Sequence, residues 1–153
     1  MPSAVFVETS GDLVVGRQAL RQAELEPGQL ERTPKRQLGS NGVLRGDRYV
    51  TGVELVSAVL RYAAAHARSL FNGAAPSSVT LTHPVDWQDK RLRGLGDAAR
   101  LAGLSVVALL PEPVAAGSAL TRRDRVAQVP VDSKVAVFDF GGGTLDIALL
   151  EQR

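Results

Sequence analysis

Residues 138–147 read Phe-Asp-Phe-Gly-Gly-Gly-Thr-Leu-Asp-Ile, with three consecutive glycines between two apolar runs. The first run, residues 135–138, predicts a buried strand that delivers Asp139 to its end, and the second, residues 145–150, leads away. Glycine permits positive φ and a close approach of a ligand, and successive N–H groups in such a turn bind anions. Asp139 and Asp146 would repel a bare phosphate, so a divalent cation would complete the site. The spacing alone leaves two interpretations open, a phosphate-binding turn and a glycine-rich hairpin with two solvated aspartates.

The residues before this turn predict helices and strands in alternation. The expected elements are strands at 4–8 and 12–16, a helix at 17–25, a hairpin at 43–50, a helix at 51–72, a strand at 78–83, a helix at 88–102, a strand at 106–110 and a helix at 113–120. Thr51 and Glu54 form a capping-box pattern at the start of the longest helix, and Asn72-Gly73 is expected to end it. Its expected buried face carries Val53, Val56, Leu60, Ala63, Ala67 and Leu70. The order within 78–120 indicates a parallel α/β unit.

Composition excludes several classes of site and partner. The 153 residues carry a net charge of +2 and no cysteine, which excludes disulfides and thiolate metal sites. No basic stripe with interleaved aromatics is present, so nucleic acid is not an expected partner. No run reaches the roughly 18–20 apolar residues of a membrane helix. A cytoplasmic protein without a membrane partner is therefore expected.

Several stretches together resemble one family. The glycine turn is similar to F-D-L-G-G-G-T-F-D, the second phosphate loop of the DnaK-type 70-kDa heat-shock chaperones, which belong to the actin-like ATPases. Three more stretches match in order: Pro34-Lys-Arg-Gln-Leu-Gly39 resembles A-K-R-L-I-G, Thr82-His-Pro-Val-Asp-Trp87 takes the place of V-P-A-Y-F, and Leu109-Leu-Pro-Glu-Pro-Val-Ala-Ala116 resembles I-I-N-E-P-T-A-A. Several ordered motifs are more specific than one glycine-rich turn.

The resemblance implies an α/β fold, a partial actin-like ATPase (ribonuclease H-like) fold with a reduced peripheral subdomain. The expected parts are a peripheral α/β subdomain at 1–76 that includes the helix 51–72, a strand-helix-strand-helix of the first lobe at 77–120, a linker at 121–133 and the phosphate-loop hairpin that opens the second lobe at 134–153. Nothing like the family's first phosphate loop precedes Pro2, and the adenosine-binding lobe does not follow Arg153. The expectation is therefore an internal segment of a nucleotide-binding domain.

The family's functional residues carry over to eight positions. Lys35, Glu112 and Asp139 are the expected catalytic residues: the lysine reaches the γ-phosphate and the attacking water, and the carboxylates order water and a hydrated metal ion. Gly141, Gly142, Gly143 and Thr144 would bind phosphate, and Asp146, with Asp139 and Glu112, would hold Mg²⁺ through water. From the residues alone, Lys35 is also compatible with a surface lysine, and Glu112 with a residue that caps a helix N-terminus.

The function that the resemblance implies is binding and hydrolysis of ATP, with ATP/ADP and Mg²⁺ as cofactors, in a bacterial chaperone. Its partners would be unfolded polypeptide clients and co-chaperones. One alternative is a degenerate, non-hydrolysing nucleotide-responsive module, favoured because Pro111 and Val114 replace hydrogen-bonding residues beside Glu112. Another is a different actin-like ATPase, such as a filament or reactivase protein. The chain by itself is expected to be inactive and to self-associate through an exposed sheet edge.

Overall fold

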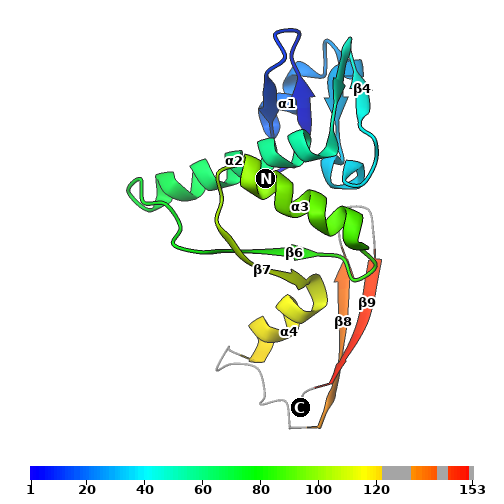
Figure 1. Ribbon diagram of the computed structural model, residues 1–153, viewed down its shortest axis with the longest axis vertical. Coiled ribbons are helices and arrows are strands. Elements are labelled where there is room, and N and C mark those ends of the chain that lie inside the picture. The colour runs from blue at the N-terminus through cyan, green and yellow to red at the C-terminus, as the bar shows by residue number, and fades with distance from the viewer. Residues whose placement is uncertain (122–131, 141–144, 152–153) are drawn as a thin grey trace. The chain divides into compact units, whose positions relative to one another are not determined.

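The computed structural model describes residues 1–121, 132–140 and 145–151, which divide into two compact units (Figure 1). Unit 1 comprises Met1–Val79 and Gln88–Val107, and unit 2 comprises Thr80–Trp87 and Ala108–Arg153. Unit 1 holds β1 (Val5–Val7), β2 (Leu13–Val15), α1 (Arg17–Gln22), the 3-10 turn η1 (Pro27–Gln29), β3 (Leu30–Glu31), the 3-10 turn η2 (Pro34–Gln37), β4 (Val43–Arg45), β5 (Arg48–Val50), α2 (Gly52–Leu70) and α3 (Asp89–Leu101). Unit 2 holds most of β6 (Val79–His83) and β7 (Val106–Pro111), and all of α4 (Glu112–Thr121), β8 (Lys134–Phe140) and β9 (Leu145–Glu151).

The core of unit 1 is an antiparallel sheet with the strand order β2-β1-β3. Side chains of a strand alternate between the two faces of its sheet, so β1 contributes to two separate clusters. One face packs against α2 and β5 in a cluster of Val5, Val7, Val15, Val50, Leu55 and Ala58. The other packs against α1 in a cluster of Ala4, Phe6, Ala19, Ala23 and Leu30. The central strand β1 is therefore buried on both sides.

The capping box predicted for α2 is confirmed. The Thr51 hydroxyl accepts from the Glu54 N–H at 3.2 Å, and a Glu54 carboxylate oxygen accepts from the Thr51 N–H at 2.8 Å. At the other end, Asn72 and Gly73 have positive φ, as their predicted role in ending the helix requires.

The predicted buried face of α2 is wrong over its C-terminal half. Its first two turns are buried through Leu55, Val56 and Ala58, whereas Ala63 is exposed and Leu70 is 68% exposed. Of the predicted face only Val56 is buried, because the side of α2 that packs on the sheet of unit 1 carries Leu55 and Ala58, which the helical spacing had not assigned to that face.

Unit 2 is built from two pairs of strands. β6 and β7 are hydrogen-bonded neighbours and run in the same direction (Figure 1), as expected for a parallel α/β unit. β8 and β9 form an antiparallel hairpin in which Phe138 lies opposite Ile147 and Asp139 opposite Asp146. α4 packs on this hairpin, where Leu150 lies close to Gly117.

The prediction of a buried strand at 135–138 is wrong. Phe138 is 59% exposed, and its neighbours on the same face, Ile147 and Leu149, are 63% and 66% exposed. The register places these three side chains on one face and Val135 and Val137 on the other, which is half-buried. Among the described residues only one face of the hairpin is covered, so an apolar run here does not mean burial on both sides.

None of the helices within the described residues combines the length and the apolar character that crossing a bilayer requires.

Candidate functional site

Lys35 lies in the short turn η2 of unit 1, which begins after Thr33. Pro34 occupies its first position, where a fixed φ and a missing N–H are tolerated. The Arg36 N–H donates to the Thr33 carbonyl at 2.9 Å, and the Leu38 N–H donates to the Lys35 carbonyl at 3.3 Å. Lys35 and Arg36 are exposed. The turn therefore presents two cationic side chains from a closed backbone loop.

The turn η2 packs closely against two helices, α2 and α3. Pro34 and Leu38 are buried, with less than 2% exposure. A Cβ on Gly52, the first residue of α2, would lie 2.2 Å from the Gln37 carbonyl oxygen, which means that the helix and the turn touch backbone to backbone. On α3, a Cβ on Gly94 would meet Leu38 at 3.3 Å. Glycine is therefore required at position 52, because any side chain there would collide with the backbone of η2.

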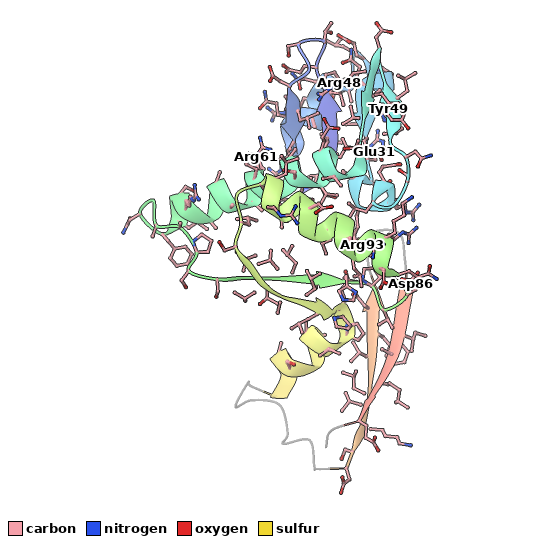
Figure 2. The ribbon with its side chains drawn as sticks, viewed as in Figure 1. Glu31, Arg48, Tyr49, Arg61, Asp86 and Arg93 are labelled. Carbon is pink, nitrogen blue, oxygen red and sulfur yellow. The ribbon has the colours of Figure 1, made fainter. Side chains whose placement is uncertain are left out.

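A buried carboxylate adjoins the same turn. Glu31 is 3% exposed, and its oxygens accept from the Thr33 N–H at 2.8 Å, from the Thr33 hydroxyl at 3.2 Å and from Gln37 Nε2 at 3.1 Å. Arg45 Nη2 pairs with it as well. Figure 2 labels Glu31 in unit 1. Glu31 was not among the predicted site residues, and no local signal marks it, because it stands between Leu30 and Arg32 in a mostly polar stretch.

The two predicted catalytic carboxylates of unit 2 line one cavity of about 260 Å³. Glu112 is the first residue of α4, directly after β7, and Asp139 lies one residue before the end of β8. The complete lining is Pro84, Val85, Asp86, Glu112, Pro113, Val137, Asp139, Ile147 and Ala148. Residues far apart in the sequence, at 112 and 139, thus line the same cavity.

Asp86 is a third carboxylate on this cavity and was not predicted as a site residue. It follows β6 as Glu112 follows β7, and the carboxyl ends of neighbouring parallel strands meet at one edge of a sheet, where ligands bind. That reasoning could have found it. The loop that carries Asp86 is ordered by Pro84, whose carbonyl accepts from the Trp87 N–H at 3.3 Å and lies 2.8 Å from His83 Nδ1.

The remaining predicted site residues are described only in part. Asp146 lies on β9 opposite Asp139, so both residues lie at the turn end of the hairpin. Gly141, Gly142, Gly143 and Thr144 lie outside the described residues, and their phosphate-binding role stays a prediction. Within the described part of the chain, no three His, Asp or Glu side chains are grouped so that they could hold a metal ion directly. A metal ion at Glu112 and Asp139 would therefore need further ligands besides these two carboxylates.

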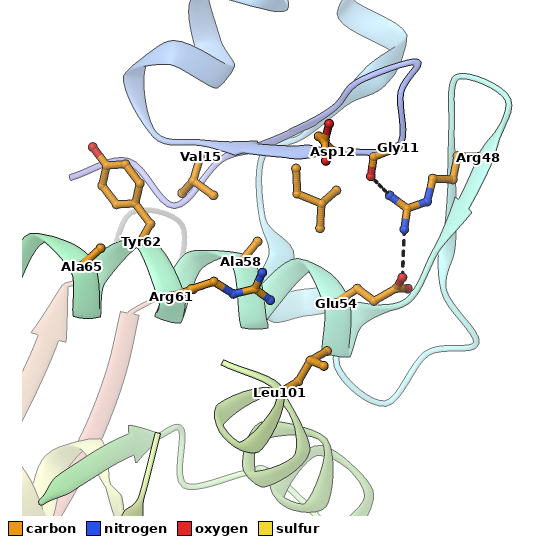
Figure 3. A pocket seen from close by; sticks show the side chains of 11 residues that line it. Gly11, Asp12, Val15, Arg48, Glu54, Ala58, Arg61, Tyr62, Ala65 and Leu101 are labelled. Atoms are coloured by element: carbon orange, nitrogen blue, oxygen red, sulfur yellow. Dashed lines mark hydrogen bonds and ion pairs between the residues drawn. The ribbon is translucent and has the colours of Figure 1, made fainter. Parts of the chain in front are cut away.

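A second cavity, of about 550 Å³, lies in unit 1 beside α2 (Figure 3). Across it the Arg48 guanidinium donates to the Gly11 carbonyl and pairs with Glu54 at 3.0 Å. Burial raises the pKa of Glu54, but hydrogen bonds from Thr51 and the charge of Arg48 outweigh it, so the pKa lies below the ordinary value of 4.5. This arrangement ties the β1–β2 turn and β5 to the start of α2.

Comparison with known proteins gives concordant matches. The family model described as "Hsp70 protein" matches residues 14–153. The chain is 35% identical over 151 residues to the "Chaperone protein DnaK" of Cenarchaeum symbiosum, 33% identical to that of Nitrosopumilus maritimus and 32% identical to that of Thermotoga maritima. Each match covers 98% of this chain but only 22%, 23% and 24% of the respective relative, so the chain spans less than a quarter of the proteins it resembles.

Proposed function

The chain belongs to the Hsp70 family, and from that premise we propose that it supplies one phosphate-contacting part of an ATP-hydrolysing chaperone domain. Its helices and sheets are those of a partial actin-like ATPase fold. In the complete protein, ATP hydrolysis would be coupled to the binding and release of unfolded polypeptides, assisted by co-chaperones in the cytoplasm. The bacterial origin and the division into peripheral subdomain, first lobe, linker and second lobe stay predictions.

The observation that carries this proposal is the shared cavity of Glu112 and Asp139. Mg²⁺ retains several of its waters and is held by one or two carboxylates together with substrate phosphates. Two carboxylates on a cavity of about 260 Å³ fit such a hydrated ion. When bound, the ion would neutralise charge on the phosphate oxygens. Glu112 and Asp139 would hold its water shell, and Asp139 would also orient the attacking water.

Lys35 has a separate task in this proposal. Phosphoryl transfer needs cationic groups on the charge that develops at the γ-phosphate. A lysine on a backbone-closed turn, with its neighbours Pro34 and Leu38 buried, is well placed to supply such a charge. Interactions made mainly in the transition state change the rate more than the affinity.

A second candidate function is a nucleotide-responsive module that does not hydrolyse ATP. The observation that favours it is the pair Pro111 and Val114, which flank Glu112 without any hydrogen-bonding side chain. Hydrolysis rates separate the two candidates.

The test is Lys35→Ala in the full-length protein that carries this segment. Single-turnover hydrolysis should fall by roughly 100-fold or more, whereas the ATP dissociation constant should change less than about threefold. Lys90→Ala is the matched control, since Lys90 is another exposed lysine of unit 1. A Lys35→Ala protein that keeps most of its rate would refute the catalytic assignment, and an inactive wild type would favour the non-hydrolysing module.

A second test measures MgATP binding and self-association of the chain by itself. A few N–H donors at the glycine turn contribute about 1 kcal/mol each, which does not offset the several kcal/mol of entropy lost on fixing a triphosphate. Calorimetry should therefore give millimolar or weaker MgATP affinity, and light scattering should show self-association through exposed strands. Micromolar binding by a monomer would contradict both expectations.

A further inference from the structure

Glu31 lies next to the turn that carries Lys35, yet no sequence motif assigns it a role. We propose that the Glu31 carboxylate is a positioning residue that holds this turn and thereby sets the rate of phosphoryl transfer without contacting the nucleotide. The proposal rests on the function proposed for Lys35 above.

The backbone of Glu31 is fixed to the core sheet. In β3, Glu31 pairs with Val5 and Leu30 pairs with Phe6 of the central strand β1. Val5 is 0% exposed and Phe6 is 5% exposed, so the strand that anchors Glu31 is buried on both faces. The carboxylate therefore projects from a strand that is paired with the buried central strand of unit 1.

From that anchor the carboxylate binds both ends of the turn. Oε1 accepts from the backbone N–H and the hydroxyl of Thr33, two residues before Lys35. Oε2 accepts from Gln37 Nε2, two residues after Lys35, at 3.1 Å. The Lys35 backbone is thus bracketed by contacts to one side chain, in addition to the turn's own hydrogen bonds.

The charge of Glu31 matters as well as its shape. An ionised carboxylate only accepts hydrogen bonds and can take about four, which equals the number of donors that surround Glu31. An amide of the same size would turn an NH₂ group toward donors from Gln37 or Arg45. Hydrogen bonds to a charged acceptor are also stronger than neutral ones. Glutamine at position 31 would therefore loosen the turn even though it fits the same space.

Loosening of this turn should affect the chemical step in particular. Displacement of a catalytic group by about 1 Å can cost on the order of 100-fold in rate. Nucleotide affinity depends on many other contacts, so it should be much less sensitive. Glu31 variants should show this split between kcat and KM when kcat is expressed per folded molecule, because a loss of folded protein alone would also lower the apparent kcat and leave KM unchanged.

The experiment uses two measurements on the same variants, Glu31→Gln and Gln37→Leu. In the full-length protein, Glu31→Gln should lower kcat by about 10–100-fold and leave KM within about twofold. Amide hydrogen exchange should become about tenfold faster at Arg36 and Leu38, whose N–H groups close the turn. Gln37→Leu removes one of the hydrogen-bond donors to Glu31. It should lower kcat and accelerate the amide exchange, each by less than Glu31→Gln does. It keeps the test decisive if Glu31→Gln does not fold.

Glu54→Gln is the matched control, because it breaks a different ion pair of unit 1, between Glu54 and Arg48. It should change neither the exchange at Arg36 and Leu38 nor kcat. Unchanged exchange at these two amides in both test variants would overturn the proposal, and so would faster exchange with an unchanged kcat. A wild-type protein without hydrolysis refutes the proposed function instead, and Lys35→Ala measured in parallel tells the two failures apart.

Discussion

Unit 1 and unit 2 both contain a sheet with apolar side chains on its two faces, but they cover these faces differently. The sheet of unit 1 has α1 against one face and α2 with β5 against the other, so Val5 and Phe6 on opposite faces are both buried. The β8–β9 hairpin has α4 against one face, while Phe138 on the other is 59% exposed. Burial of a strand is thus decided by the layers that cover it and not by its own composition.

The largest expected effect is that of Gly52→Ala in unit 1. The new Cβ would lie 2.2 Å from the Gln37 carbonyl oxygen and 2.7 Å from the Leu38 nitrogen, which are backbone atoms that cannot rotate away. Overpacking of this kind should lower the free energy of unfolding by about 3 kcal/mol. Chemical denaturation followed by far-UV circular dichroism measures it, since α2 and α3 both belong to unit 1.

Gly96→Ala is the control for that substitution. Gly96 is also helical, in α3, but nothing lies within 4 Å of its Cβ position. Alanine should therefore stabilise the helix by up to about 1 kcal/mol. Equal destabilisation by both substitutions would mean that the close contact at Gly52 is not what makes its glycine necessary.

The next effect tests the comparison between the two units directly. Leu55 is 0% exposed in the core of unit 1, and its replacement by alanine should cost about 2–3 kcal/mol. Phe138 carries a larger side chain on the uncovered face of unit 2, yet Phe138→Ala should cost less than about 1 kcal/mol. Circular dichroism follows unit 1, and the fluorescence of Trp87, the only tryptophan, follows unit 2. A cost for Phe138→Ala that equals that of Leu55→Ala would show that this face is covered in solution.

The smallest effect concerns Glu54 and the pH dependence of unit 1. Its pKa is lower in the folded chain than the ordinary value of 4.5, so its contribution to stability is complete above that value and is lost as the pH falls through the folded pKa. Glu54→Gln keeps a capping-box residue at this position but removes the charge. Denaturation at about pH 6 and about pH 3 should therefore show a smaller loss of stability in Glu54→Gln than in the wild type. An identical loss in both proteins would contradict the assigned role of Glu54.

The sequence predicted well the features that are formed by residues close together in the chain. The capping box of Thr51 and Glu54 and the positive φ of Asn72 and Gly73 involve residues a few positions apart, and all are present. The paired strands on either side of the glycine turn were also expected and are present. The candidate site was predicted in part: Glu112 and Asp139 share a cavity, but Asp86 on the same cavity was missed.

By itself the sequence determined the family and the order of the longer helices and strands, though not the short strand β3, because these depend on motifs and on short-range spacing. The tertiary structure alone decided that Glu31 is buried beside the Lys35 turn, that Gly52 must lack a side chain and that Phe138 remains exposed. These three outcomes depend on which elements pack against each residue. Contacts between residues distant in the chain, such as Arg45 with Glu31, arise only when the strands have paired and the helices have docked.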